Sequence, residues 1–243
     1  MKFDYDVAVI GAGSGGLTVA FWLSAAGKKV ALIEGGPIWG DCTNFGCVPS
    51  KALIDISKHS PELGFKKALK LVRERREIIQ DEESPDKIES KNLKLFQWFA
   101  SFKGDNTLNI TDSEKSQITA KKIVIASWSK AKKIEIKWVK AENILTNEEI
   151  FEQTDDIKNL VIIWGGYIGC ELAESIAALG VTVHLVQRNK DLVPNEEQES
   201  RDLLRKIFEE KGIKVHTEMT ATSWTDTEIT LTSKDEKMSI SVP

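Results

Sequence analysis

The chain has 243 residues, 41% of them hydrophobic, which is enough for one large domain or two ordinary ones. Its formal net charge is −4, with Lys and Arg scattered among Asp and Glu, so no basic face indicates binding to nucleic acid or to an anionic membrane. Three cysteines without a plausible signal peptide indicate a reducing compartment, so we expect a cytoplasmic protein, and no apolar run is long enough to span a membrane.

The N-terminal segment predicts a dinucleotide-binding turn. We expect a buried strand over residues 6–10, a helix over 15–26 and a second buried strand over 30–33. The turn carries G-x-G-x-x-G, and an acid follows its first glycine by 23 residues. A helix start there can hold a pyrophosphate, and the acid can accept hydrogen bonds from an adenosine ribose. A purely structural glycine loop is the alternative; the expected binding residues are Gly11, Gly13, Ser14, Gly15, Gly16 and Glu34.

The stretch GDCTNFGCVPSK holds the two cysteines that are close enough in sequence to act together. In a continuous helix, Cys42 and Cys47 would lie roughly 8 Å apart at Cα, too far for a disulfide, so we expect an irregular turn leading into a helix that extends through Ile56. Pro49 suits the first turn of that helix. The helix amides and Lys51 favour a thiolate, the reactive form of cysteine. Two buried structural cysteines in a loop are the alternative.

The rest of the first half combines helix and sheet patterns. Residues 61–83 predict a mostly solvated amphipathic helix. The segments LKLFQWFASF, NTLNI and SQITA predict an antiparallel meander with turns at Gly104-Asp105 and Asp112-Ser113. Residues 122–126 predict a short buried strand that returns to the first sheet.

The second half repeats the design of the first. Thr146 to Glu149 form a capping box that opens a short helix after a connector of about twenty residues. Residues 160–186 predict a second strand, turn, helix and strand, followed by a charged helix over 196–211 and several short strands over 213–242. We therefore expect an α/β protein with two Rossmann-like dinucleotide-binding domains, each with a parallel sheet and an antiparallel meander. The expected domains are residues 1–145 and 146–243.

Two such units with C-x-x-x-x-C-V-P-S-K after the first resemble the pyridine nucleotide-disulfide oxidoreductases, the flavoprotein family that includes lipoamide dehydrogenase, mercuric reductase and glutathione reductase. The resemblance implies FAD in the first domain and NADPH or NADH in the second. It implies that Cys47 faces the flavin, that Cys42 exchanges with substrate, and that Lys51 lies at the flavin and pairs with Glu171. The nicotinamide site would comprise Gly165, Gly166, Tyr167, Ile168, Gly169, Glu171, Gln187 and Arg188.

The implied activity is FAD-dependent NAD(P)H:disulfide oxidoreduction. Electrons would pass between nicotinamide, flavin and a Cys42-Cys47 disulfide to a small or protein-bound disulfide or dithiol, or to a metal substrate as in mercuric reductase. No resident metal site is expected, because none of the three histidines lies near the cysteine pair at zinc-ligand spacing. Cys170 is expected to be a packing residue.

Compared with the family pattern, the chain lacks the A-x-G-D segment that completes the FAD site and the interface domain with its His-Glu pair. The FAD domain is therefore expected to be incomplete and turnover poor, while a full-length relative would be a homodimer. A non-catalytic dinucleotide-binding fragment is the alternative function. At the second acid position, Gln187 followed by Arg188 favours NADPH over NADH, although an exposed arginine with no such role fits equally well.

Tryptophan stands where the family has glycine at several positions. Trp39 precedes Gly40, Trp128 lies in ASWS, Trp138 ends a stretch like the family's IPG, and Trp164 takes the first place of the second G-x-G-x-x-G. Glycine there lets backbone approach phosphate, so Trp164 puts nicotinamide binding in question. One hypothesis is that UGA codons for glycine have been read as tryptophan; the alternative is seven ordinary tryptophans, the remaining three being Trp22, Trp98 and Trp224.

Overall fold

The computed structural model describes residues 2–82, 85–111, 116–131, 133, 144–225 and 228–241. The chain divides into two compact units, each of which is considered by itself. Unit 1 comprises residues 1–49 and 75–131, and unit 2 comprises residues 50–74 and 132–243. Residues 50–74 thus pack with the second half of the chain, whereas a continuous first domain over residues 1–145 was expected. The domain division at residue 145 stays a prediction.

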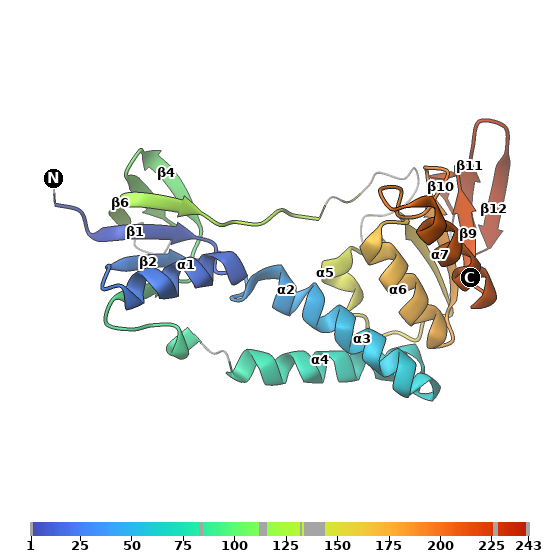
Figure 1. The fold of residues 1–243 in the computed structure, drawn as a ribbon, viewed down its shortest axis with the longest axis horizontal. Coiled ribbons are helices and arrows are strands. Elements are labelled where there is room, and N and C mark those ends of the chain that lie inside the picture. The colour runs from blue at the N-terminus through green and yellow to red at the C-terminus, as the bar shows by residue number, and fades with distance from the viewer. Residues whose placement is uncertain are drawn as a thin grey trace. The chain divides into compact units, whose positions relative to one another are not determined.

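Unit 1 is built on a six-stranded sheet with the order β3-β2-β1-β6-β5-β4. Strands β1 and β2 run parallel and are connected by helix α1, as the expected strand-turn-helix-strand unit requires (Figure 1). The elements are β1 (Tyr5–Ile10), α1 (Ser14–Ala25), β2 (Val30–Ile33), α2 (Gly40–Asn44), η2 (Pro85–Lys87), β3 (Leu93–Phe96), β4 (Ala100–Gly104), β5 (Thr107–Ile110) and β6 (Gln117–Ile125).

The central strands of unit 1 are buried on both faces, which explains their unbroken apolar sequence. Val9 and Leu32 lie in one core cluster together with Leu17 of α1. Ala8 and Ile33, which point to the opposite face, lie in a second cluster with residues of β5 and β6. The parallel register of β1 and β2 brings the ends of both strands, where the glycine turn and the acid follow, to the same edge.

Two strand expectations for unit 1 were wrong in part. Leu93–Phe96 does not belong to the meander, because β3 pairs parallel with β2, and Leu93 is 2% exposed in the α1-side core. The meander is β4, β5 and the first half of β6. The second half of β6 returns to β1 in parallel, as expected, but it is not buried, since Ile125 is 66% exposed. The alternation of apolar and polar residues could not predict these pairings. It indicates that one face of a strand is buried, but not which strand lies next to it.

The turn between β4 and β5 lies at Asp105 and Asn106, next to the expected Gly104-Asp105 position. The second expected turn, at Asp112-Ser113, lies outside the described residues.

Unit 2 contains a three-stranded parallel sheet with the order β7-β8-β9 and a three-stranded antiparallel sheet with the order β10-β11-β12. The fold is therefore α/β with parallel and antiparallel sheets, as the sequence indicated. The elements that lie wholly or partly in this unit are α3 (Cys47–His59), η1 (Pro61–Leu63), α4 (Gly64–Glu82), α5 (Asn147–Ile150), β7 (Asn159–Ile163), α6 (Tyr167–Ala178), β8 (Thr182–Gln187), α7 (Gln198–Glu210), β9 (Lys214–Thr217), β10 (Thr220–Trp224), β11 (Glu228–Thr232) and β12 (Lys237–Ser241).

The core of unit 2 explains why α4 carries its pattern. Phe65, Ala68, Leu69 and Val72 recur at helical spacing and are each at most 1% exposed, while most of the charged residues between them face solvent. They pack in one cluster with α3, α6 and the helix side of β8. The amphipathic helix is confirmed, and its buried stripe accounts for the assignment of this segment to unit 2.

The opposite face of the parallel sheet is covered by the antiparallel sheet. Val186 of β8 packs in one cluster with Met219, Ile229, Leu231 and Ile240. Both faces of β8 are consequently buried, including the polar side chains of His184 and Gln187.

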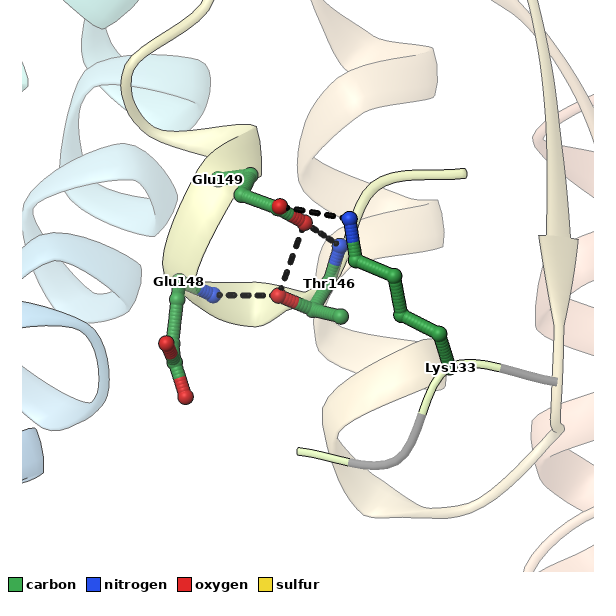
Figure 2. A network of polar contacts seen from close by, with 4 residues as sticks. All are labelled: Lys133, Thr146, Glu148 and Glu149. Atoms are coloured by element: carbon green, nitrogen blue, oxygen red, sulfur yellow. Dashed lines mark hydrogen bonds and ion pairs between the residues drawn. The ribbon is translucent and has the colours of Figure 1, made fainter. Parts of the chain in front are cut away.

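Helix α5 begins with the predicted capping box (Figure 2). The Thr146 hydroxyl accepts a hydrogen bond from the Glu148 amide at 3.3 Å, and the Thr146 amide donates to the Glu149 carboxylate at 2.8 Å. Lys133 binds the other Glu149 oxygen at 2.6 Å. The hydrogen bond from Lys133, followed by those from Thr146, holds the pKa of Glu149 below its usual range. The cap therefore fixes where helix α5 begins, ahead of β7.

Among the described residues, no helix combines the length and apolarity needed to cross a membrane.

Candidate functional site

The first glycine turn lies between β1 and α1. Gly11 has φ +107°, and a Cβ there would lie 2.5 Å from the Ala126 carbonyl oxygen. A Cβ on Gly16 would lie 1.8 Å from the Gly11 carbonyl oxygen, so the turn and the helix meet backbone to backbone. Gly13 caps α1 without a side-chain hydrogen bond, and Ser14 and Gly15 open the first turn. The amides at this helix start are therefore donors for an anion.

Glu34 lies at the end of β2, beside this turn. One carboxylate oxygen accepts a hydrogen bond from the Ala12 amide at 2.7 Å, and the other accepts from the Gly36 amide at 2.7 Å. Two amide donors orient the carboxylate toward the turn, and each oxygen retains lone-pair capacity for a hydroxyl. The expected ribose acceptor is thus positioned by the backbone at the glycine turn. The glycines, the helix-start amides and this acid together fit the ADP half of a dinucleotide.

The cysteine stretch forms two helices. Cys42 lies inside α2 (Gly40–Asn44), and Cys47 is the first residue of α3. An irregular turn was expected around Cys42, whereas the break is confined to Phe45 and Gly46; a Cβ on Gly46 would lie 2.9 Å from the Asp41 carbonyl oxygen, so glycine permits this tight break. Both cysteines are exposed, which excludes the buried structural alternative. Pro49 lies in the first turn of α3, as predicted.

Asn44 holds this segment, and the sequence analysis missed it. Its amide donates to the carbonyls of Ile38 and Gly40 at 2.8 Å each, and its side-chain oxygen accepts from Gln80 at 2.6 Å. Its own carbonyl accepts from Arg76 at 3.1 Å. At 3% exposure, this asparagine forms a buried polar network at the end of the helix that carries Cys42. The nearest sequence signal is a polar residue between two cysteines, which is too general to have identified it.

Lys51 and Glu171 form the ion pair that the resemblance implied. The Lys51 ammonium lies 2.6 and 2.7 Å from the two Glu171 oxygens, joining α3 to α6 within unit 2. Their side chains are 59% and 40% exposed. An ion pair this exposed contributes at most about 1 kcal/mol to stability, so a role in stability does not account for it.

The second glycine turn repeats the backbone of the first. Trp164 has φ +106°, and its amide donates to the Val186 carbonyl at 2.8 Å, as Gly11 donates to Ile33 at 2.7 Å. A Cβ on Gly169 would lie 2.0 Å from the Trp164 carbonyl oxygen. Gly166 caps α6 without a side-chain hydrogen bond. The other expected residues of this turn are the buried Gly165 and the exposed Tyr167 and Ile168.

The position that corresponds to Glu34 is Gln187, which is buried. It is 3% exposed, its oxygen accepts from the Arg188 amide at 3.0 Å, and its nitrogen donates to the Asp191 carbonyl at 3.4 Å. Arg188 itself is exposed. An ion pair between Asp191 and Arg201 at 2.7 Å fixes the loop that follows. The second turn therefore has an amide at the position that corresponds to the Glu34 carboxylate, and an exposed cation lies next to it.

Tyr167 donates a hydrogen bond to Glu196 at 2.5 Å, a contact that sequence reasoning did not anticipate. This hydrogen bond, together with desolvation, raises the pKa of the Tyr167 phenol. Cys170, three residues further on, is buried in the core, where burial raises its pKa to about 11. A thiol with that pKa stays protonated at neutral pH, which agrees with its expected packing role.

A histidine pair between β8 and β9 was also missed. His184 and His216 stack with an interplanar angle of 2°, and Nδ1 of His184 lies 3.1 Å from Nε2 of His216. Burial lowers the pKa of His184 to about 4, and burial followed by the charge of Lys214 lowers the pKa of His216. Within the described ranges, no group of three or more His, Cys, Asp or Glu is arranged to hold a metal.

Comparison with known proteins agrees with this geometry. Residues 5–242 match the family model of pyridine nucleotide-disulphide oxidoreductases. The chain is 29% identical over 231 residues to a mercuric reductase of Bacillus cereus, covering 89% of this chain and 36% of that protein. It is 30% identical over 231 residues to a dihydrolipoyl dehydrogenase of Geobacillus stearothermophilus, covering 88% and 48%.

The fold resembles that of RclA, an HOCl-induced flavoprotein disulfide reductase from Escherichia coli. The solved structure of RclA superposes with a TM-score of 0.85 at 23% identity, over 97% of this chain and 54% of that one. The chain thus spans about half or less of the length of the relatives it matches. The match to the family model covers almost all of its residues, so the chain belongs to the pyridine nucleotide-disulphide oxidoreductase family.

Proposed function

We propose that this chain supplies the flavin, nicotinamide and thiol elements of an FAD-dependent NAD(P)H:disulfide oxidoreductase. The observation that carries the proposal is the exposed pair Cys42 and Cys47, held on α2 and at the start of α3, in a chain that also has an ADP-type turn at Gly11. The bound flavin would supply two-electron transfer between a nicotinamide and a disulfide. FAD would lie at Gly11, Gly13, Ser14, Gly15, Gly16 and Glu34, and the nicotinamide cofactor at residues 165–169 and Glu171 with Gln187 and Arg188.

The thiol chemistry follows from the two cysteines. The Cys42 thiolate attacks one sulfur of a substrate disulfide, forming a mixed disulfide and releasing the first substrate thiolate. The Cys47 thiolate then attacks the Cys42 sulfur, which releases the second thiolate and leaves a Cys42-Cys47 disulfide. Two electrons return the pair to dithiol form in each cycle. A dihydrolipoyl dehydrogenase runs the same exchange in reverse, and a mercuric reductase passes the electrons to a metal substrate.

The start of α3 supports a reactive role for Cys47. Cys47 is its first residue and Lys51 follows one turn later, so the thiol lies at the N-terminus of a helix that also carries a cation. Lys51 is held by Glu171, which fixes the ammonium. We propose that this ion pair lies at the flavin and stabilises its reduced form.

The nicotinamide cofactor is proposed to be NADPH, with NADH as the competing choice. A neutral, buried Gln187 removes the acceptor that selects a free ribose 2′-hydroxyl, and the exposed Arg188 can bind a 2′-phosphate. Reduction rates with the two nucleotides at equal concentration decide between them. An Arg188→Ala variant that loses the NADPH preference supports the assignment, and one that keeps it contradicts it.

The enzyme assignment is tested by absorbance. Chain reconstituted with FAD and reduced by dithiol is expected to develop a long-wavelength charge-transfer band from the thiolate next to the flavin. Cys47→Ser should abolish the band, whereas Cys42→Ser should retain it and lose disulfide exchange. A chain that binds FAD but shows neither the band nor thiol oxidation would support the dinucleotide-binding fragment instead.

A further inference from the structure

Two of the non-glycine residues with positive φ in the described chain are tryptophans. They are Trp39, with φ +73°, and Trp164, with φ +106°; the others are Val193 and Glu218. A bulky side chain in this region clashes with its own backbone, so it is an outlier wherever it occurs, whereas glycine occupies the region without strain.

Position 164 has a direct reference within the same chain. Gly11 has φ +107°, donates the equivalent backbone hydrogen bond, and is approached in the same way by the helix glycine that follows five residues later. The two turns share these features although one begins with glycine and the other with tryptophan. The fold therefore imposes a glycine conformation on position 164.

Position 39 also has a left-handed backbone conformation that glycine adopts without strain. Trp39 caps α2 in the left-handed region, with ψ −2°, and is followed by Gly40 with φ +64°. Its amide donates to the Ala12 carbonyl at 2.9 Å, and a Cβ on Gly40 would lie 2.9 Å from the Gly13 Cα. Two consecutive residues with positive φ are pressed against the first glycine turn, and a chain with glycine at both adopts this conformation without strain.

Four of the indole side chains are largely exposed to solvent. Trp22, Trp98, Trp128 and Trp164 are 77%, 46%, 82% and 67% exposed. Tryptophan normally contributes through a large buried area, so exposure of this extent at four positions lacks the usual physical reason for the residue. Trp39 and Trp224 are partly buried and pack against their clusters, and Trp138 lies outside the described residues.

We propose that positions 39 and 164 are glycine in the protein as its source organism makes it, because the codon there is UGA read as glycine. With glycine at 164, the second turn reads G-x-G-x-x-G, like the first, and its backbone is open to a pyrophosphate. This consequence for cofactor binding rests on the proposed function. The conformational assignment does not, since it follows from φ and hydrogen bonding alone.

Stability provides the first test. Trp39→Gly and Trp164→Gly should each lower the equilibrium constant for unfolding of their unit by about fivefold, because left-handed strain is removed. Trp22→Gly is the matched control, since Trp22 is exposed at the start of the last turn of α1; it should raise that constant by roughly twofold, the usual effect of glycine in a helix. If all three variants were destabilised alike, the assignment would be overturned.

Tandem mass spectrometry of peptides from protein purified from its source cells provides the second test. The proposal predicts glycine at positions 39 and 164, and by the same codon at the other tryptophan positions that UGA encodes. Tryptophan in the native peptides at 39 and 164 would overturn it.

Nucleotide titration separates this inference from the proposed function. Trp164→Gly should bind NADPH or NADH about tenfold more tightly than the chain with tryptophan, while Trp22→Gly should bind as the parent does. If Trp164→Gly gains stability and native peptides carry glycine, but neither form binds a nicotinamide nucleotide, the residue assignment stands and the nicotinamide site fails. If nucleotide binding improves without a gain in stability, the conformational assignment is overturned.

Discussion

The two strand-turn-helix units differ most at their first turn residue and least in their backbone. Gly11 and Trp164 have φ values of +107° and +106°, and each is contacted at its carbonyl by a helix glycine whose Cβ would clash. The sheet and helix fix the course of the chain, because their hydrogen bonds and core contacts outweigh the local strain of one residue. The two turns have the same backbone conformation although one begins with glycine and the other with tryptophan. The tertiary structure, and not the local residue, therefore determines the conformation of the turn.

At the end of the second strand of each unit, by contrast, the side-chain environments differ. Glu34 accepts hydrogen bonds from the Ala12 and Gly36 amides, whereas Gln187 is buried and bonded to the Arg188 amide and the Asp191 carbonyl. An ionised carboxylate orients donors around it and stays partly exposed, while a neutral amide can be buried once its own groups are satisfied. The two positions therefore differ in burial and in the hydrogen-bonding partners of their side chains.

The largest effect is expected from adding one methyl group at a turn. Gly16→Ala places a Cβ 1.8 Å from the Gly11 carbonyl oxygen, and Gly169→Ala places one 2.0 Å from that of Trp164. Each should destabilise its unit by about 3 kcal/mol or more, measured by chemical denaturation. Gly15→Ala, with no heavy atom within 4 Å of its Cβ, should leave stability unchanged or slightly raised. If Gly169→Ala were tolerated while Gly16→Ala destabilised its unit, the two turns would not be structurally equivalent.

Acid is expected to affect unit 2 through its histidine pair. The folded pKa of His184 is about 4, below its ordinary value of 6.5, so the unfolded chain binds more protons between these values. Stability that is complete above about pH 6.5 should fall by on the order of 3 kcal/mol as the pH drops toward 4. The free energy of unfolding measured across this range gives the slope. His184→Gln should flatten it, and an unchanged slope in this variant would contradict the prediction.

Asn44 sharpens the comparison, because the cysteine segment that it holds follows the first glycine turn and has no counterpart after the second. Asn44→Ala removes two donated hydrogen bonds and leaves Gln80 without its acceptor, so unit 1 should lose about 2 kcal/mol. Urea denaturation measures this loss. Asn92→Ala removes one long hydrogen bond to Ser24, at 3.4 Å, and should cost less than about 1 kcal/mol. Equal losses would contradict a special role for Asn44.

The smallest effect on stability is expected at the ion pair. Lys51→Met should change the free energy of unfolding by less than about 1 kcal/mol, because both partners are exposed. It should nevertheless slow flavin reduction, if Lys51 lies at the flavin as proposed. Lys158→Met, which removes a similarly exposed pair with Asp156 at 2.6 Å, should change neither quantity. Equal reduction rates for Lys51→Met and the parent chain would remove Lys51 from the proposed site.

Local pattern by itself determined much of the chain. The sequence predicted the order strand, glycine turn, helix and strand in both halves of the chain. Buried parallel strands have unbroken apolar sequences, and glycine turns have a fixed glycine spacing. The capping box at Thr146 could be predicted because its residues lie within one turn of each other in the sequence. The apolar stripe of α4 could be predicted because the spacing of its apolar residues matches the period of an α-helix.

Only the tertiary structure determined which strands are neighbours and which side chains contact one another. It placed β3 beside β2 and not in the meander, it buried Asn44 at the end of the cysteine helix, and it stacked His184 on His216. It also showed that Trp164 adopts the conformation of Gly11. Sequence pattern reports which face of an element is buried, whereas strand neighbours, buried amide networks and the φ of a turn depend on residues far away in the chain, whose positions are set only when the sheets close.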